Sequence, residues 1–248
     1  MKIGIIGFGS IGSFLARNLK SDVLWVMDNS PEAKKRFLSS NLKCKFFSSL
    51  PKKAGGAALV VEAASQQAVP LLSKCLPRCS VMVMSVGALA DDKLRISLLS
   101  MAKKHKRSIY IPSGAIGGTD AISALNGNLE TVLLETTKPP ASLGRKDQRR
   151  AAVFEGSARE ACGLFPQNVN VSATLSLAGI GFDRTIVRIV SDPDARANTH
   201  KIFARSKSCT MVLEFENLPS EENPKTSALA LSSALRRIEK MDETLQIG

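Results

Sequence analysis

The chain has 248 residues, of which 44% are hydrophobic and 23% are charged, a composition typical of a globular protein and unlike that of a disordered or fibrous one. Its net charge is +12, but the basic residues are spread along the sequence and only 5% of residues are aromatic. We therefore expect no nucleic-acid partner and a basic surface that attracts anionic ligands. No apolar run approaches the roughly 18 residues that span a membrane, and the first residues lack the pattern of a signal peptide. These features predict a cytoplasmic protein that does not associate with membranes.

Cysteine and histidine are too scattered to form a recognisable metal site. The five cysteines include one close pair, Cys75 and Cys79, whose C-x-x-x-C spacing matches neither a zinc knuckle nor a redox C-x-x-C motif. The two histidines, His105 and His200, are far apart, and His105 lies in the basic run "MAKKHKRS". We therefore predict no bound metal, and His200 is the histidine that needs an explanation.

The first part of the chain alternates buried strands with amphipathic helices. Strands are expected in "KIGII", "VLWVMD", "AALVVEAAS", "SVMVMSVGAL" and "SIYIPSGAIGG". One of the helices between them begins at Pro31, behind the candidate caps Asn29 and Ser30, and Ser65 is expected to cap the helix "QQAVPLLSKCL". This alternation predicts an α/β domain with a doubly wound parallel sheet over residues 1–112.

The pattern changes after residue 112, where strands begin to follow strands. Strands are expected in "TVLLETTKPP", "AAVFEG", "TIVRIV", "HKIFARS" and "TMVLEFEN", a capping box in "SARE", and a helix ended by glycine in "NVNVSATLSLAG". We therefore expect a second, mixed α+β domain over residues 113–222. Apolar residues at helical spacing from Lys225 to Leu245 predict a C-terminal helix, within residues 223–248, that packs back onto the first domain.

The most informative local motif is "GFGSIG", a G-x-G-x-x-G pattern between the first strand and the first helix. Gly7 allows the tight turn, Gly9 lets the backbone approach a pyrophosphate, and Gly12 lets helix and strand pack closely. The phosphates then lie at the N-terminus of the helix. The predicted cofactor contacts in this loop are Gly7, Phe8, Gly9, Ser10, Ile11 and Gly12.

Asp28, at the end of the second strand, bears on which cofactor binds. An acid at this place can accept hydrogen bonds from the adenosine ribose hydroxyls and repels a 2′-phosphate, which favours NAD. Lys34, Lys35 and Arg36 are close enough in sequence to weaken that preference. We predict NAD and leave NADP open.

Two further stretches leave alternatives open. Glu62 ends the third strand and either lines the nicotinamide side of the crevice or acts as a helix-capping or loop acid. The loop "PSGAIGG", with Gly114, Gly117 and Gly118, is either a flexible linker or a place where backbone passes close to a ligand. Its position at the domain change favours the ligand.

Several stretches together resemble the L-aspartate dehydrogenase family: "GFGSIG", "VEAAS", "PSGAIGGTDA", "TTKPPASL", "FEGSAREA", "FPQNVNVSATLSLAG", "SDPDARANTHKI" and "ENPKTS". They occur in order over nearly the whole chain. The resemblance implies an NAD(P)-dependent oxidoreductase that converts L-aspartate to iminoaspartate, which feeds NAD biosynthesis or hydrolyses to oxaloacetate and ammonia. It also implies a Rossmann domain joined to an α/β domain that commonly forms a homodimer, and functional coupling to a quinolinate-forming enzyme.

The same resemblance assigns three site residues. It places the catalytic role on His200 in "NTH", and cofactor contacts near the nicotinamide on Ala115 and Asn170. Hydride transfer from Cα of aspartate requires a neutral amine and a group that manages protons, and a histidine with a pKa of about 6.5 suits general acid–base work. A solitary histidine between strands is more often a packing residue. The cofactor motif, the resemblance and the scarcity of histidine favour proton handling.

The two carboxylates of aspartate need cationic or N–H donors. Lys225 is the first candidate, with Thr226 and Ser227 as donors at the start of the last helix and Asn198 as a residue that orients the substrate. The alternative for Lys225 is a solvated first-turn lysine, although a cation is unfavourable at a helix N-terminus without another role.

Two other functions stay open at this point. One is another Rossmann oxidoreductase that acts on an amino or oxo diacid, similar to homoserine dehydrogenase or dihydrodipicolinate reductase. The other is a cofactor-binding sensor without catalysis. Substrate profiling separates the first, and His200→Ala separates the second, because a sensor would keep its cofactor binding and its signal.

Overall fold

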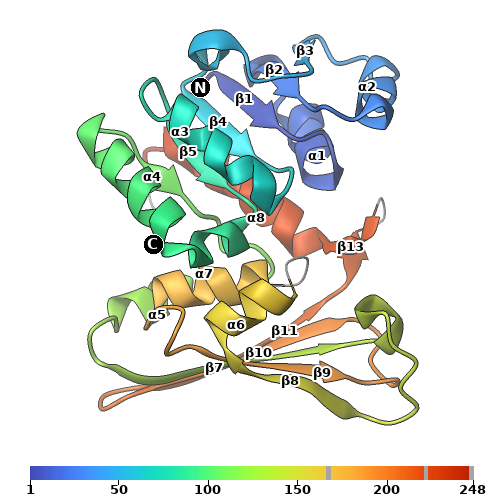
Figure 1. The fold of residues 1–248 in the computed structure, drawn as a ribbon, viewed down its shortest axis with the longest axis vertical. Coiled ribbons are helices and arrows are strands. Elements are labelled where there is room, and N and C mark those ends of the chain that lie inside the picture. Colours follow the sequence, from blue (N-terminus) through green and yellow to red (C-terminus); the bar gives the residue numbers. More distant parts are fainter. Residues whose placement is uncertain (166–168, 221–222, 246–248) are drawn as a thin grey trace. The chain divides into compact units, whose positions relative to one another are not determined.

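The computed structural model describes residues 1–165, 169–220 and 223–245, with the backbone alone for Ser21, Pro219, Ser220 and residues 223–225. The chain divides into two compact units (Figure 1). The first consists of Met1–Pro112 together with the segment that begins at Ala234, and the second is Ser113–Ser233.

The first unit is built on a six-stranded parallel sheet. Its strands are β1 (Ile3–Ile6), β2 (Val23–Met27), β3 (Lys45–Phe47), β4 (Leu59–Glu62), β5 (Ser80–Val83) and β6 (Ile109–Tyr110). The spatial order β3-β2-β1-β4-β5-β6 is that of a doubly wound dinucleotide-binding sheet, so the predicted fold class is confirmed. The edge strand β3 was not predicted, because its three residues "KFF" are too few to show a strand period.

Helices connect these strands, as the alternating pattern predicts. They are α1 (Ser10–Leu19), α2 (Pro31–Leu38), α3 (Leu72–Cys75) and α4 (Asp92–Lys104). Ser30 caps α2, because its hydroxyl accepts from the N–H of Ala33 at 3.2 Å. The helix predicted after Ser65 is instead a 3₁₀ segment, η3 (Gln66–Leu71), followed by the short α3, and Ser65 makes no side-chain cap. Pro70 accounts for this interruption, because it has no N–H to donate within a helix.

The C-terminal helix starts later than predicted. The hairpin of β12 (Pro219–Ser220) and β13 (Asn223–Ser227) precedes α8 (Ala228–Glu239) and η6 (Lys240–Asp242). The predicted helical start at Lys225 is therefore wrong. The chain turns at Ser227, whose hydroxyl accepts from the N–H of Ala230 at 3.1 Å. Ala234 and Ile238 of α8 are buried in the same core as residues of α1, which confirms that this helix packs onto the first domain.

The second unit contains a five-stranded mixed sheet. Its strands are β7 (Leu129–Lys138), β8 (Ala151–Ser157), β9 (Ile186–Ser191), β10 (Asn198–Ser206) and β11 (Thr210–Asn217), in the spatial order β11-β10-β7-β9-β8. Neighbouring strands are antiparallel except for the parallel pair β7 and β9. All five strands were predicted from the sequence.

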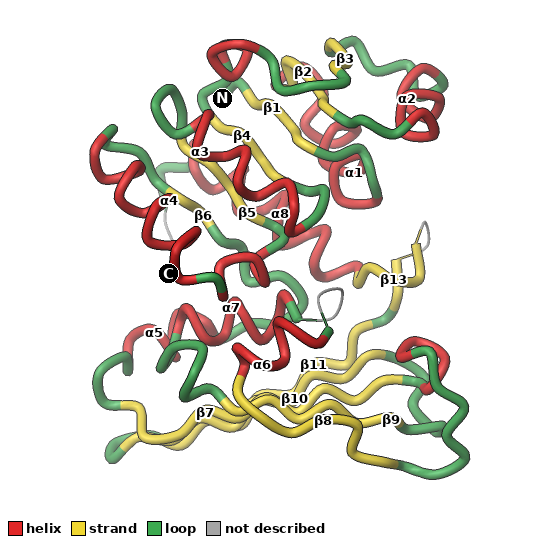
Figure 2. The backbone as a smooth tube through the Cα atoms, viewed as in Figure 1, coloured by secondary structure: helices red, strands yellow, loops and turns green. Residues whose placement is uncertain are grey.

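Helices cover one face of this sheet (Figure 2). They are α5 (Thr119–Ala124), α6 (Ala158–Leu164) and α7 (Asn170–Ala178). The predicted capping box is present, with Ser157 and Glu160 bonded reciprocally at the start of α6. Leu134 and Ile202 of the sheet pack with Ile122 and Leu175 of the helices in one core. None of the helices in the described part of the chain has the length and apolar character that crossing a bilayer requires.

Candidate active site

The glycine-rich loop joins β1 to α1 with the backbone geometry that its motif predicts. Gly7 has a φ of 98°, and a Cβ at this residue would lie 2.5 Å from the carbonyl oxygen of Ala63. A Cβ on Gly12 would collide with the carbonyl group of Gly7, so glycine is needed for α1 to pack this closely. A Cβ on Gly9 would meet nothing within 4 Å. Space is therefore left beside the loop at the residue expected to approach a pyrophosphate.

The first turn of α1 fits the phosphate groups of a nicotinamide dinucleotide. The first N–H groups of a helix have no carbonyl partner within it, and the helix dipole adds positive potential there. The hydroxyl of Ser10 is buried and has no hydrogen-bond partner among the described residues. A buried polar group without a partner costs about 1–3 kcal/mol. A phosphate oxygen would supply that partner.

Asp28 and Arg36 hold the glycine-rich loop from the side of β2. Asp28 Oδ2 accepts from the N–H of Phe8 at 2.7 Å, and Oδ1 accepts from the N–H of Ser30 at 2.9 Å. The guanidinium group of Arg36, on α2, donates to the carbonyl oxygen of Phe8 at 3.1 Å. The ring of Phe8 is buried and Ile11 is half-buried. An acid and a cation thus flank one residue of the loop, and of the three nearby cations named from the sequence, Arg36 is the one bonded there.

Glu62 ends β4 and is completely buried. Its Oε1 accepts from the N–H groups of Ala64 and Ser65, at 2.8 and 3.0 Å, and from the hydroxyl of Ser85 at 2.9 Å. Its Oε2 accepts from the N–H of Ser85 at 3.0 Å. Burial raises the pKa of this carboxyl group, while the four donors act in the opposite direction. Of the two interpretations, the structure favours a loop acid, which ties together the chain segments that follow β4 and β5.

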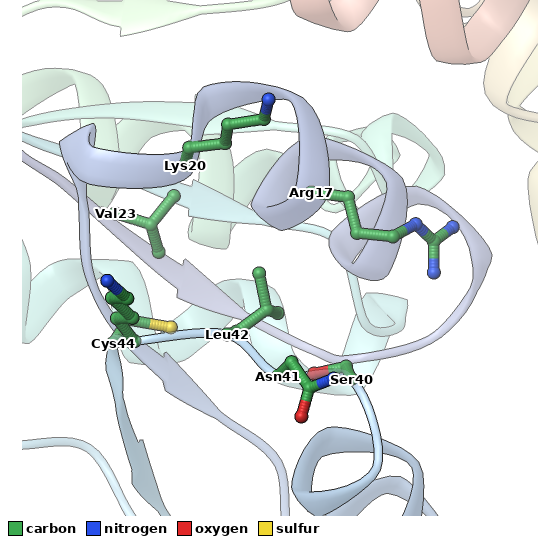
Figure 3. Close-up of a pocket in the computed structure, with 8 residues that line it drawn as sticks. Arg17, Lys20, Val23, Ser40, Asn41, Leu42 and Cys44 are labelled. Carbon is green, nitrogen blue, oxygen red and sulfur yellow. The ribbon is translucent and has the colours of Figure 1, made fainter.

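A hollow of about 670 Å³ lies at the amino ends of β2 and β3, opposite the strand ends that carry Asp28 and Glu62 (Figure 3). Arg17 and Lys20 line it from the end of α1, together with Val23 at the start of β2 and residues 40–44 before β3. It is not the predicted cofactor site, because the glycine-rich loop follows the carboxyl end of β1. Burial raises the pKa of the Cys44 thiol in its wall, which keeps this thiol protonated and unreactive.

In the second unit, His200 lies on β10 with its side chain on the helix-covered face, 5% exposed. It stands opposite Thr136 of β7, and His200 Nδ1 and Thr136 Oγ1 are 3.0 Å apart, within hydrogen-bonding distance. Burial, with a smaller contribution from the positive charge of Lys138, lowers the pKa of His200 to about 3. The sequence argument assumed an ordinary pKa of about 6.5. In the fold, the ring is instead neutral throughout the physiological pH range.

Lys138 is the last residue of β7 and lies two residues after Thr136, on the same face of the strand. Its side chain is 8% exposed, and burial lowers its pKa to about 8. Its charge acts on His200, so the two groups form one electrostatic cluster. Sequence reasoning did not single out Lys138. The available signal was a lysine at a buried position of an alternating strand, immediately before two prolines.

The loop that carries Ala115 is attached to the end of β11. Asn217 is buried, and its side-chain amide donates to the carbonyl oxygen of Ala115 at 2.9 Å. Asn217 is also the register partner of Asn198, which begins β10 two residues before His200. The structure therefore brings Ala115 and Asn198 to the same end of the sheet as His200. Glycine is required in this loop, because Gly118 has a φ of 72° and a Cβ there would lie 2.5 Å from Leu213.

The remaining predicted residues lie elsewhere in the second unit. Asn170 is the exposed first residue of α7. Thr226 and Ser227 are half-buried in β13, and Ser227 caps α8. The backbone of Lys225 lies in β13, and its side chain lies outside the described residues. The described residues contain no group of three or more His, Cys, Asp or Glu side chains that could hold a metal ion.

Two family profiles match this chain. The profile described as "Homoserine dehydrogenase, NAD binding domain" matches residues 7–112, and the profile described as "Aspartate dehydrogenase, C-terminal" matches residues 120–241. The first match agrees with the parallel sheet and its glycine-rich loop, and identifies the first unit as an NAD(P)-binding domain. The second match covers His200, Thr136 and Lys138.

Full-length relatives and solved structures agree with these profiles. The chain is 42% identical to the L-aspartate dehydrogenase of Methanosarcina mazei over 269 residues, and 42% identical to that of Methanocaldococcus jannaschii over 268 residues. Each match covers 100% of this chain and 99% of the relative. The crystal structure of aspartate dehydrogenase from Thermotoga maritima matches with a TM-score of 0.83 and 31% identity, over 100% of this chain and 99% of that one. A hyperthermophilic archaeal homoserine dehydrogenase in complex with NADPH, at 16% identity and a TM-score of 0.59, shares the fold alone. The chain therefore belongs to the L-aspartate dehydrogenase family.

Proposed function

We propose that this protein is an NAD(P)-dependent dehydrogenase that oxidises L-aspartate to iminoaspartate. The observation that supports this most strongly is an identity of 42% over the whole chain with proteins named L-aspartate dehydrogenase. The local geometry agrees with it, because one unit has a loop suited to a dinucleotide and the other has a buried, neutral histidine. The link to NAD biosynthesis and to a quinolinate-forming enzyme stays a prediction from the resemblance.

In this proposal the residues of the glycine-rich loop hold the cofactor. The N–H groups of the first turn of α1 and the hydroxyl of Ser10 bind the phosphates, and Asp28 accepts from the adenosine ribose. Each carboxylate oxygen of Asp28 can accept a second hydrogen bond, so its bonds to backbone N–H groups leave room for the ribose. We propose NAD as the preferred cofactor, with NADP tolerated through Arg36, whose guanidinium group lies beside the same loop. When bound, the nicotinamide ring supplies the hydride acceptor.

The proposed reaction has two proton-transfer steps. Aspartate must lose a proton from its ammonium group before hydride leaves Cα, because the nitrogen lone pair forms the C=N bond. A water molecule must also lose a proton if the imine is hydrolysed. We propose that His200 acts as general acid and base in the second step. Its neutral ring can accept a proton, Thr136 sets its orientation, and its low pKa makes it release that proton readily.

The remaining assignments are proposals from position and resemblance. Ala115 and Asn170 contact the nicotinamide half of the cofactor, and Asn217 keeps the backbone of Ala115 in place. We propose that the substrate carboxylates are held by Asn198, Lys225, Thr226 and Ser227.

We also propose that the protein forms a homodimer through the sheet face that its helices leave uncovered. Phe203 pairs in register with Val212 on one side and Leu133 on the other, and Leu133 pairs with Ile186. These side chains form an apolar row across four strands. Val212 is 57% exposed, Ile186 is 44% exposed and Phe203 is 37% exposed. A contiguous exposed apolar row of this kind is typical of a protein contact.

The homodimer can be tested with a charge placed in that row. Phe203→Glu should convert a dimer into a monomer in light scattering coupled to gel filtration, because it buries a charge at the centre of the contact. Lys207→Glu, in the exposed turn between β10 and β11, is the matched control and should leave the dimer intact. A monomeric wild-type protein, or a dimeric Phe203→Glu variant, would contradict this surface.

The activity is tested by reduction of NAD, and separately of NADP, with L-aspartate in the wild-type protein and in His200→Ala. We expect cofactor reduction with aspartate in the wild-type protein. In His200→Ala the reverse reaction, NADH oxidation with oxaloacetate and ammonia, should fall by about 10²–10⁴-fold, because the imine must form before hydride transfer, and the variant should still bind the cofactor. Oxidation of another amino or oxo diacid in preference to aspartate would favour a sibling oxidoreductase. Tight cofactor binding without turnover of any such acid would favour a sensor.

A further inference from the structure

Lys138 lies where a second proton-transfer group could act beside His200. It stands on the helix-covered face of β7, two residues beyond the threonine that bonds His200, and the protein buries nearly all of it. We propose that Lys138 is the general base that removes a proton from the ammonium group of the substrate before hydride transfer. This inference rests on the proposed function and assigns one step of its mechanism.

The strand register explains why Lys138 and His200 act on one another. Thr137 pairs with Thr199, and Thr136 pairs with His200, so Lys138 lies one residue beyond the last of these pairs. Side chains two residues apart on a strand share a face, which places Lys138, Thr136 and His200 on one side of the sheet. At this separation the charge of Lys138 contributes to the lowered pKa of His200, after the larger effect of burial.

Burial prepares Lys138 for accepting a proton. An exposed lysine has a pKa of about 10.4 and is almost entirely charged near neutral pH. Burial disfavours the charged form and lowers the pKa of Lys138 to about 8, so a neutral amine is available close to physiological pH. His200 is not suited to this step, because its low pKa makes it a far weaker base toward an ammonium group than Lys138.

The titratable groups near Lys138 lie on β10 and just beyond the ends of β9 and β8. His200 faces it from β10. On the other side, Ser191 of β9 is its register partner, and Asp192 follows, donating its backbone N–H to the carbonyl oxygen of Lys138 at 2.9 Å. The carboxylate of Asp192 lies 3.7 Å from the guanidinium group of Arg150. Burial is the cause of the lowered pKa of Lys138.

The proposed step balances as a single proton transfer. One N–H bond of the substrate ammonium group breaks, and one N–H bond forms at Nζ of Lys138, which becomes charged. The freed lone pair of the substrate nitrogen forms the C=N bond as hydride leaves Cα, and the substrate becomes a protonated imine. Lys138 then returns its proton to solvent, which matches the one proton released overall.

The test compares the wild-type protein with Lys138→Met, Lys138→Ala and the control Lys207→Ala. Methionine fills the volume of lysine without a charge, so Lys138→Met should fold even if Lys138→Ala does not. In the wild-type protein, kcat/KM for aspartate oxidation should rise with pH up to about 8 and then level off. Both Lys138 variants should lose about 10²–10⁴-fold in kcat together with this rise. Added ethylamine should restore part of the activity of Lys138→Ala, and Lys207→Ala should behave as wild type.

Other outcomes overturn the inference in distinguishable ways. If the Lys138 variants keep the wild-type pH profile and lose only affinity for aspartate, Lys138 is a carboxylate-binding cation and not the base. If kcat changes less than about threefold, Lys138 has no chemical role. A wild-type protein that does not oxidise aspartate removes the proposed function itself, whereas the other two results leave that function standing. Independently of turnover, Lys138→Met should raise the pKa of His200 in NMR titrations, because a nearby positive charge is removed.

Discussion

Protonation of His200 should oppose folding, and acidification is the perturbation that reveals it. His200 is 5% exposed, and its pKa in the fold is about 3. In the unfolded chain an ordinary histidine pKa of about 6.5 applies. Between these values the unfolded chain binds a proton that the folded chain does not. The stability contributed by the neutral ring is therefore complete above about pH 6.5 and is lost as the pH falls toward 3.

The size of this effect follows from the two pKa values. At about 1.36 kcal/mol per pH unit, the difference corresponds to at most about 5 kcal/mol once the pH is below both values. Only part of this is realised in an accessible range. Between about pH 7 and about pH 4, His200 should reduce the free energy of unfolding by about 3 kcal/mol. Protonation of carboxylates also destabilises the fold in acid, so the contribution of His200 must be measured relative to a variant that lacks it.

His200→Gln is that variant, because glutamine can still bond Thr136 but does not titrate in this range. Urea unfolding at several pH values should show the wild-type protein losing about 3 kcal/mol more than His200→Gln. NMR gives a direct check, since the chain has two histidines and the variant identifies the signal of His200. That signal should not move between about pH 8 and pH 5. A midpoint of about 6.5, or parallel loss of stability in both proteins, would refute the reasoning.

Three further predictions concern hydrogen bonds that the structure shows. Thr136→Val should cost about 1–3 kcal/mol in urea unfolding, because it leaves Nδ1 of buried His200 without its partner, whereas Thr136→Ser should be close to wild type. Glu62→Gln should cost a similar amount in the same assay, since an amide nitrogen would then face an N–H or O–H donor of the loops it joins; equal stability would mean that these bonds do not need a carboxylate. Asn217→Ala should accelerate hydrogen exchange in the loop of residues 113–118, and unchanged exchange there would show that other contacts hold that loop.

Much of the fold could be predicted because its signals are local. The glycine-rich turn, the Ser30 cap of α2 and the capping box of α6 each depend on residues within one turn of the chain. Buried strands and amphipathic helices have their own periods, so their alternation was enough for a parallel sheet. The predictions were wrong where a local signal was weak or interrupted. Pro70 broke an expected helix into a 3₁₀ segment, and apolar spacing extended the last helix back over β13.

The sequence by itself also determined the family, because its motifs run in order along the chain and include His200. The tertiary structure alone decided the chemical state of that residue. The pKa of a side chain depends on burial and on nearby charges, and Thr136 and His200 are 64 residues apart in sequence. Strand pairing between β7 and β10 brings Thr136 and His200 together and places Lys138 on the same face. The fold also removes His200 and Lys138 from water. No local pattern encodes that register, so the neutral histidine and its pairing with the buried lysine emerge only from the folded chain.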